Sequence, residues 1–409
     1  MDFFRVQTTH QVKEMLKEFP PLGKEDVVLE NSLGRILAED IISPEDLPSF
    51  NRATMDGYAL RAKDTFGASE GSPALLEVQG EINMGERPSN EIQRGGGVKI
   101  STGGMLPEKA DAVVMVEHTQ VIDETTIEVF RAVAPGENVI QRGEDLKQGE
   151  RILEKGQRLR AQDLGALAAL GMGMVNVYRR PRVGIISSGN EVVPIDSVPH
   201  EGEIRDINRY TLWALSIESG CEPFHLGVAR DELEDLQKKL EQGLCKGDVV
   251  LISGGSSVGT RDLTIEALNS LPQAEILLHG VAVSPGKPTI LAKVNEKTIW
   301  GLPGHPVSAM VIFMTLVTPS LWRLGGCTNW DSPHPWTLKT KVSRNIHSAQ
   351  GREDYVRVKL NLEAGKLIAT PVFGKSGSIS TMVKGDGLLR IEMESEGIQE
   401  GEEVDVWPF

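Results

Sequence analysis

Four short polar segments of this sequence carry residue types that bind anions and cations. Their glycines and serines expose backbone N–H groups that can hold an anion, and two of the segments lead straight into predicted helices, whose dipole favours negative charge. Three of the segments also hold a carboxylate, at Glu191, Asp231 and Asp262. Carboxylates beside a phosphate-binding backbone are suited to a bridging Mg²⁺. The segments are Ser187–Glu191, Ala229–Glu232, Ser253–Asp262 and Gly301–Ser308.

Plainer explanations of these residues stay open. Loops between strands and helices are commonly small and polar, and Asp231 and Asp262 could each act as a helix N-cap. Lys287 stands between two prolines, where a rigid turn could aim its charge at an anion or leave it in solvent. His305, between a glycine and a proline, could contact a ligand or have a purely structural role in the loop.

Several catalytic patterns are missing from the sequence. Gly254 and Gly259 have P-loop spacing, but Thr260-Arg261 follows in place of Lys-Ser/Thr, which argues against a Walker-type NTPase. The eight histidines show no H-x-x-x-H or H-E-x-x-H spacing, and the three cysteines form no C-x-x-C pair. A zinc hydrolase, a zinc finger and a disulfide framework are therefore disfavoured.

The elements that must position the polar segments read as alternating strands and helices. Apolar runs indicate strands buried on both faces, and amphipathic stretches between them indicate covering helices, so we expect a parallel sheet. Ligands of such a sheet bind beyond the carboxyl ends of the strands, where all four polar segments then fall. The predicted strands are Arg182–Ile186, Glu222–Val228, Asp248–Ile252 and Glu275–Val283, and the predicted helices are Asn208–Ser219, Leu233–Leu244 and Asp262–Leu271.

The N-terminal part of the chain and residues 150–180 contain helical patterns of another kind. Thr8 and Gln11 have capping-box spacing and precede an amphipathic pattern that ends before Pro20. Weaker patterns predict a short helix at Asn31–Ala38 and another helix at Ala161–Leu170.

Two further stretches read as β structure. Short β-like runs between glycines and prolines mark residues 51–149 as an inserted all-β module. In the last 80 residues or so, alternating apolar residues around Ala364-Gly365 predict a small antiparallel domain. The apolar stretch Val307–Val317, which is too short to span a bilayer and stops before Pro319, reads as a buried helix.

Composition narrows the class of protein. The 43 basic and 58 acidic side chains give a net charge of −15 at pH 7. This argues against nucleic-acid and membrane partners, since DNA, RNA and anionic lipid surfaces favour a positive protein. The N-terminus shows no secretory signal and the cysteines form no framework, so we expect a cytoplasmic protein. The 43 glycines favour backbone-lined loops that hold small anions without net positive charge.

Seven motifs, taken in order along the chain, carry a resemblance to a known family. They are Thr54–Ala59, Ser101–Gly104 with Ala110–Val114, Gly143–Asp145, Ser188–Glu191, Ser253–Gly259, Pro285–Pro288 and Gly301–Ser308. Together they resemble MoeA, the molybdopterin molybdenumtransferase family that includes the E domain of gephyrin. Each motif alone is weak evidence for a family. The ordered set is specific for this family, and the resemblance covers essentially the whole chain.

The resemblance implies an α/β multidomain fold and a homodimer. A MogA-like parallel α/β sheet domain would be joined by an inserted β-rich module, an elongated helical segment and a small C-terminal β-barrel-like domain. The active site would lie between the sheet domain of one protomer and the β module of the other. The implied domains are residues 1–50 with 150–180 (linking and dimerisation), 51–149 (β-rich), 181–327 (molybdopterin-binding) and 328–409 (C-terminal β).

The resemblance also implies the reaction and its residues. The family takes adenylylated molybdopterin, made by a MogA-like adenylyltransferase, together with molybdate, releases AMP and leaves the metal on the dithiolene. Mg²⁺ is the expected cofactor, held by Glu191, Asp231 and Asp262. The implied catalytic residues are Asp56, Thr102, Asp145, Glu191, Asp231, Asp262 and Lys287, and the implied substrate-binding residues are Ser188, Gly189, Gly254, Gly255, Ser256, Gly259, Pro303, Gly304, His305, Pro306 and Ser308.

Two positions depart from the family pattern and leave the choice of oxyanion open. Ser284 stands where a lysine is common, and His305 stands where an asparagine is common. A protonated histidine could restore part of the lost positive charge. Tungstate has the same charge as molybdate and nearly the same size, so a tungstate-inserting paralogue is also compatible with the sequence. A MogA-like adenylyltransferase and a non-catalytic molybdopterin-binding scaffold are two competing hypotheses of a different class.

Overall fold

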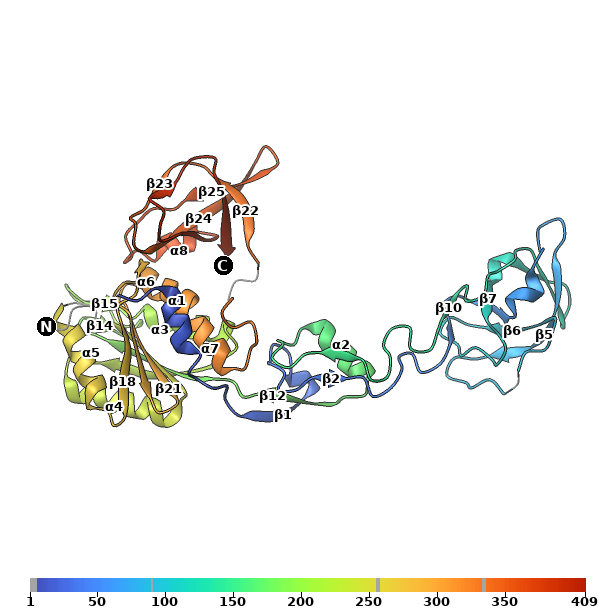
Figure 1. Ribbon diagram of the computed structural model, residues 1–409, viewed down its shortest axis with the longest axis horizontal. Coiled ribbons are helices and arrows are strands. Elements are labelled where there is room, and N and C mark those ends of the chain that lie inside the picture. Colours follow the sequence, from blue (N-terminus) through green and yellow to red (C-terminus); the bar gives the residue numbers. More distant parts are fainter. Residues whose placement is uncertain (1–5, 90, 255–257, 333–335) are drawn as a thin grey trace.

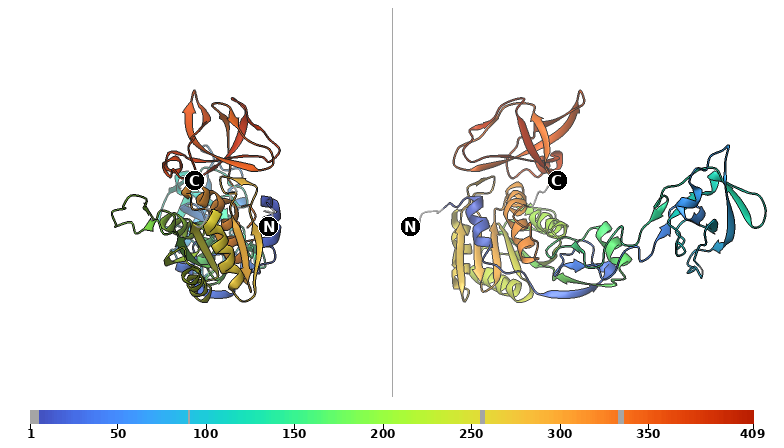
Figure 2. Two further views of the ribbon diagram at one scale, coloured as in Figure 1. Left: turned by 90° about the vertical axis from the view of Figure 1, so that its left-hand side faces the viewer. Right: turned by 45° about the vertical axis from the view of Figure 1, so that its right-hand side comes forward.

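The protein is elongated, with folded units at both ends. The computed structural model describes residues 6–89, 91–254, 258–332 and 336–409, and for residues 258–262 it describes the backbone alone. An α/β domain and the C-terminal β domain lie side by side at one end of the molecule (Figures 1 and 2). A narrow middle module connects them to a distal β module at the opposite end (Figure 1).

A six-stranded sheet in the order β16-β13-β17-β21-β20-β18 forms the centre of the α/β domain. The first four strands are parallel, so their carboxyl ends share one edge. Two antiparallel pairings, of β20 with β21 and of β18 with β20, extend the sheet. The alternation of strands and helices in the sequence predicted a parallel sheet and did not predict this antiparallel extension. The strands are β13 (Arg182–Ser188), β16 (Glu222–Ala229), β17 (Val249–Gly254), β18 (Ala274–His279), β20 (Ile290–Val294) and β21 (Lys297–Leu302).

Helices cover both faces of this sheet because its strands are apolar on both sides. Val249 and Leu251 of β17 pack into one core cluster, and Val250 and Ile252 pack into the other. This alternation places α4 and α5 on one face and α1, α3, α6 and α7 on the other. The helices are α1 (Thr9–Leu16), α3 (Asn208–Glu218), α4 (Leu233–Lys246), α5 (Val258–Ser270), α6 (Pro306–Ile312) and α7 (Thr318–Leu324).

Several predicted elements of this domain agree with the structure, and two predicted boundaries in it were wrong. The Thr8 capping box is present at the start of α1. The helix expected from Asp262 begins instead at Val258, so Asp262 lies inside α5 and is not its N-cap. The strand expected at Glu275–Val283 ends at His279, because Gly280 takes a φ of +105° and turns the chain. Of the remaining residues only Val283 is in a strand, β19 (Val283–Ser284), which pairs with a strand of the C-terminal domain.

The apolar helix after β21 is longer than the sequence pattern indicated. It continues through a π-helical turn, η4 (Phe313–Val317), and past Pro319 as far as Leu324. Proline is tolerated there because it occupies the first turn of α7, where its missing N–H costs little. Within the described residues, Pro306–Leu324 is the one helix long and apolar enough to cross a membrane, and 78% of it is buried inside the protein. That burial is typical of a core helix.

The middle module is a slender unit built from two chain segments. Its core is formed by a small apolar cluster that includes Leu37, Leu159 and Val177. The helix expected at Asn31–Ala38 was wrong: a single 3₁₀ turn, η1 (Leu29–Asn31), is followed by extended chain, because Gly34 has a φ of +73°. The other elements are β1 (Lys24–Val28), β2 (Ile41–Ile42), β11 (Arg151–Leu153), α2 (Ala161–Ala169) and β12 (Met174–Tyr178).

The distal module is all-β apart from two 3₁₀ turns, as the turn-rich sequence predicted. Its sheet has the order β7-β4-β6-β5-β9-β8. The elements are β3 (Arg52–Ala53), β4 (Gly57–Leu60), η2 (Ala62–Thr65), β5 (Ala74–Ile82), β6 (Gly96–Ile100), β7 (Ala112–Met115), η3 (Val116–His118), β8 (Thr119–Val121), β9 (Thr126–Val129) and β10 (Val139–Ile140).

The C-terminal domain is a small closed barrel. Its sheet runs β24-β25-β22-β28-β26, and an additional β24–β26 pairing closes it. The predicted hairpin is present, with both Ala364 and Gly365 at positive φ in the turn. The elements are β22 (Leu338–Val342), β23 (Ile346–His347), β24 (Glu353–Glu363), β25 (Lys366–Pro371), α8 (Ser380–Lys384), β26 (Gly387–Ile391), β27 (Gly397–Ile398) and β28 (Glu403–Pro408). The predicted arrangement, a parallel α/β sheet domain with a β-rich insert, an elongated segment and a small C-terminal β-barrel-like domain, is thus confirmed.

Candidate functional site

Three of the four predicted polar segments surround a cavity of about 70 Å³ at the carboxyl edge of the sheet. Ser188 and Gly254 lie opposite each other where β13 and β17 end. A Cβ on Gly254 would lie 2.0 Å from the Ser188 carbonyl oxygen, so only glycine permits this close approach. Asn208, the first residue of α3, donates from Nδ2 to Ser253 Oγ at 2.5 Å and to the Gly304 carbonyl at 2.7 Å. It therefore joins two of the polar segments.

The second polar segment is tied to the first through Asp231. The Asn190 N–H donates to Asp231 Oδ2 and the Asp231 N–H donates to Asn190 Oδ1, both at 3.3 Å. Asp231 Oδ1 is buried without a hydrogen-bond partner in the described part of the chain. Glu191 folds back over Gly189, whose φ of +144° leaves room for its carboxylate. The N-cap role considered for Asp231 was wrong, because Glu232 occupies that position before α4.

A larger cavity of about 670 Å³ lies beside the fourth segment, between the α/β domain and the barrel. Lys287, Pro303, His305 and Ser308 all line it, together with Arg352. Among the described lining residues there is no carboxylate, and the charged side chains in the wall, Lys287 and Arg352, are both basic. Such a wall suits a small anion.

The barrel contributes to this cavity because it is joined to the sheet domain by a strand. Strand β19 (Val283–Ser284) leaves the α/β domain and pairs in parallel with the start of β24. This brings Arg352, one residue before β24, to the Lys287 turn. The Arg352 guanidinium is oriented by Asp354, with Nε 3.2 Å from Oδ1. On the opposite wall His305 Nδ1 and Ser376 Oγ form a hydrogen bond of 2.8 Å.

In the distal module the structure brings Asp56 and Thr102 together. The backbone N–H and the hydroxyl of Thr102 both donate to Asp56 Oδ1, at 2.6 and 2.8 Å. These bonds, the backbone one foremost, lower the pKa of Asp56, because they stabilise its ionised form. Both residues are exposed, so a charged carboxylate is presented at the surface of the module.

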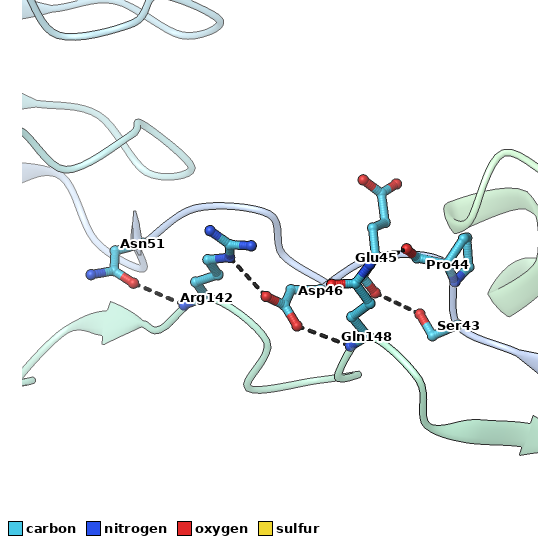
Figure 3. Close-up of polar contacts among 7 residues, drawn as sticks. All are labelled: Ser43, Pro44, Glu45, Asp46, Asn51, Arg142 and Gln148. Carbon is cyan, nitrogen blue, oxygen red and sulfur yellow. Dashed lines mark hydrogen bonds and ion pairs between the residues drawn. The ribbon is translucent and has the colours of Figure 1, made fainter.

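Asp145 lies in the linker between the distal and middle modules, where its N–H donates to the Leu47 carbonyl at 3.1 Å. Two chain segments run side by side in this linker (Figure 3). Asp46 holds the two segments together, accepting from the Gln148 N–H at 2.9 Å and from Arg142 Nε at 2.8 Å (Figure 3). The Arg142 N–H donates to Asn51 Oδ1 at 2.8 Å. This linker clasp, Asp46 with Arg142 and Gln148, fixes the direction in which the distal module leaves the middle module.

The predicted site residues therefore fall into two groups within one chain. The sheet-edge group includes Glu191, Asp231 and Lys287, and the distal group consists of Asp56, Thr102 and Asp145. Figure 1 shows the sheet edge and the distal module at opposite ends of the molecule. The distal group cannot complete the sheet-edge site of its own chain in this conformation.

Some of the predicted residues are not tested by the structure. Gly255 and Ser256 lie outside the described residues, and the Asp262 side chain does so as well. Gly259 falls in the first turn of α5. Where side chains are described, no group of three His, Cys, Asp or Glu residues is arranged to hold a metal. The predicted set of Glu191, Asp231 and Asp262 remains a prediction.

The structure adds residues that the sequence analysis missed. Arg352 and Ser376 belong to the C-terminal domain, for which no chemical role was predicted, and only the fold brings them to the Lys287 turn. Asn208 was assigned only to a helix start. Its polar amide at the first position of a helix after a polar turn was the one signal that could have drawn attention to it.

Comparison with known proteins gives consistent matches along the chain. Residues 6–171 match the family described as MoeA N-terminal region (domain I and II), residues 184–323 match a probable molybdopterin binding domain, and residues 339–409 match MoeA C-terminal region (domain IV). The molybdopterin molybdenumtransferase of Haemophilus influenzae is 34% identical over 97% of this chain and 96% of its own. That of Bacillus subtilis is 34% identical over 93% and 88%.

Solved structures agree with these sequence matches. The structure described as the molybdopterin biosynthesis MoeA protein from Pyrococcus horikoshii is 38% identical, covers 99% of both chains and superposes with a TM-score of 0.82. A second structure of a MoeA protein from that organism, 32% identical, gives a TM-score of 0.85 over 99% of this chain and all of the other.

Proposed function

Because the chain belongs to the MoeA family, a family of molybdenum cofactor biosynthesis, we propose that it is a molybdopterin molybdenumtransferase. It takes adenylylated molybdopterin and molybdate, cleaves the bond to AMP and leaves molybdenum on the dithiolene. The observation that carries the proposal is the cavity of about 670 Å³ at the sheet edge, whose described lining residues include Lys287 and Arg352 and no carboxylate. The adenylylated substrate comes from a separate MogA-like adenylyltransferase.

The cavity offers a suitable environment for a tetrahedral oxyanion. Lys287 and Arg352 supply positive charge, and the Ser308 and Ser376 hydroxyls supply neutral donors. Ser308 is 5% exposed, so a hydrogen bond from its hydroxyl forms away from bulk water. The family lysine replaced here by Ser284 is offset by Arg352 from the barrel and by His305 when protonated. Molybdate, or tungstate in its place, is the substrate that these residues would hold.

The neighbouring cavity of about 70 Å³ suits the phosphate-bearing part of the substrate. Ser188, Gly254 and Gly304 line it, and the loop backbone there can donate to phosphate oxygens. The tie made by Asn208 keeps the loops in one arrangement before the substrate arrives, which lowers the entropic cost of binding.

The residues at the sheet edge fit a hard cation such as Mg²⁺. Asp231 Oδ1 is a buried carboxylate oxygen without a hydrogen-bond partner in the described residues, and Glu191 supplies a second carboxylate in the adjoining loop. Carboxylate oxygens are the ligands that Mg²⁺ favours. Asp231, Glu191 and Asp262 would hold the ion, which when bound would neutralise charge developing on the phosphate.

The distal module must come from a second protomer if Asp56 is to reach the substrate. We propose a homodimer in which the partner's distal module covers the sheet edge. Helix α3 supports an interface, because Ile207, Tyr210, Trp213 and Ile217 on and next to it are each 39–46% exposed and recur at helical spacing. The ionised Asp56 would then orient the water that attacks the phosphate.

The experiment that tests the proposal supplies adenylylated molybdopterin with molybdate or tungstate and measures AMP release and metal insertion. Parallel arms with ATP and metal-free molybdopterin test for adenylyltransferase activity. We expect AMP release that depends on an oxyanion, and about a hundredfold or greater loss in Lys287→Ala. Substrate binding without AMP release would contradict the proposal and favour a scaffold. Light scattering of wild type and Trp213→Glu tests the dimer.

A further inference from the structure

A second large cavity, of about 740 Å³, lies in the seam between the middle module and the α/β domain. Its walls come from both units, and it shares no lining residue with the two sheet-edge cavities. The Thr328 N–H donates to the Gly156 carbonyl across the seam at 3.1 Å. Figure 1 shows this junction beside α7 and β12. We name it the seam cavity. Its volume lies in the range of sites for small organic ligands.

Arginines are concentrated in the wall of the seam cavity. Five line it, against one carboxylate among the described lining residues, Glu154. Such a concentration is unexpected in a chain whose net charge is −15. The five arginines are Arg35, Arg158, Arg160, Arg179 and Arg180.

Three of these arginines already have carboxylate partners. Arg179 makes a bidentate pair with Asp248, with distances of 2.8 and 3.0 Å. Arg160 is bound in the same way by Asp163, and Arg35 pairs with Glu25. The charges of these three are therefore largely balanced, and they serve to hold the two units in place.

Arg158 and Arg180 have no such partner among the described residues. The Arg180 Nε is buried and makes no hydrogen bond, which is costly for a charged group unless a ligand or water completes it. Arg158 makes one long bond of 3.4 Å to the Glu218 carbonyl. Its guanidinium lies against the backbone of Gly34 and Gly220, which belong to different units, so it spans the seam.

Both unpaired guanidinium groups lie in the wall of the same cavity. A group with two negative charges would match two guanidinium forks, each able to donate two parallel hydrogen bonds. Tyr178 and Trp322 in the wall provide aromatic surface for an organic body attached to that group.

We propose that the seam cavity is a binding site for a small phosphate monoester, held by Arg158 and Arg180. A ligand there contacts both units and stabilises one angle between them. Because the middle module carries the distal module, occupancy of the seam cavity also biases where the distal module points. The site goes beyond the transferase reaction and does not depend on it.

Titration calorimetry on the full chain tests the site, with inorganic phosphate and phenyl phosphate as probes. We expect phenyl phosphate to bind more tightly than inorganic phosphate, and the double variant Arg158→Gln/Arg180→Gln to weaken binding about tenfold or more. Arg131→Gln, which removes an exposed arginine of the distal module, is the matched control and keeps the wild-type affinity. Lys287→Ala removes phosphate that binds in the sheet-edge cavity, so the binding that remains in this variant is the part assigned to the seam cavity.

Thiol alkylation provides an independent readout. Cys327 is half-buried in the wall of the seam cavity, whereas Cys245 is exposed on α4 and serves as internal reference. Saturating phenyl phosphate slows alkylation of Cys327 and leaves Cys245 unchanged. In the Lys287→Ala background, phosphate binding that survives the double arginine variant overturns the proposal, and so does phosphate binding that Lys287→Ala alone abolishes. One further result overturns the proposal: Cys327 is fully protected from alkylation without any ligand, and no phosphate binds. A second copy of the chain would then fill the cavity.

Discussion

Replacing Asn208 by alanine tests whether this residue fastens the sheet-edge loops. Asn208 is 8% exposed and donates at 2.5 Å to Ser253 and at 2.7 Å to Gly304. Each buried hydrogen bond of this kind contributes about 1 kcal/mol net, so losing both costs about 2 kcal/mol. For a unit of this size that loss lowers the unfolding temperature by about 4–8 °C.

The assay is urea and thermal unfolding of the full chain, followed by tryptophan fluorescence. Trp300 is fully buried in β21 of the same sheet and reports on this domain. The matched control is Asn361→Ala in the barrel, where the side chain makes one long bond of 3.4 Å to Thr370 and we expect a change below about 0.5 kcal/mol. An Asn208→Ala protein that unfolds at the wild-type midpoint would refute the assignment of Asn208 as a structural tie.

Three further predictions follow from the geometry. Gly254→Ala places a Cβ 2.0 Å from the Ser188 carbonyl, so the ends of β13 and β17 must separate and we expect a loss of about 1–3 kcal/mol in unfolding free energy together with loss of turnover. Thr102→Ala removes one of the two bonds that lower the pKa of Asp56. If ionised Asp56 orients the attacking water, as we propose, the acidic limb of the pH–rate profile moves to higher pH in this variant, while Thr102→Ser keeps it in place. Asp46→Ala opens the linker clasp. We expect this variant to turn over more slowly while the sheet domain unfolds at the wild-type midpoint. A loss of turnover together with a lower midpoint would point to misfolding instead.

The elements that were predicted well are those specified by local chemistry. The Thr8 capping box and the Ala364-Gly365 turn depend on neighbouring residues alone, and both are present. The buried strands were recognisable because they are covered on both faces and need an unbroken apolar run. Gly34, by contrast, takes a left-handed conformation that ends the pattern read as a helix at Asn31–Ala38.

The candidate site was predictable only in part, because it depends on long-range packing. The loops after the parallel strands could be placed together from the chain order alone. The contribution of Arg352 could not, since it depends on the pairing of β19 with β24 across two domains. The end of the apolar helix was also predicted wrongly, because the sequence pattern was taken to stop before Pro319. Proline is compatible with the first turn of α7, so the chain stays helical beyond it. No local pattern specifies that a new helical turn begins there.

A heterodimer of two inactive chains shows whether the active site is shared between two protomers. Chains carrying Asp56→Ala and Lys287→Ala are co-expressed with different tags, and the mixed dimer is purified through both. If the partner's distal module completes each site, one of the two clefts carries both substitutions and the other carries neither, so AMP release returns to about half of the wild-type rate. A mixed dimer as inactive as the two parent homodimers would contradict the account.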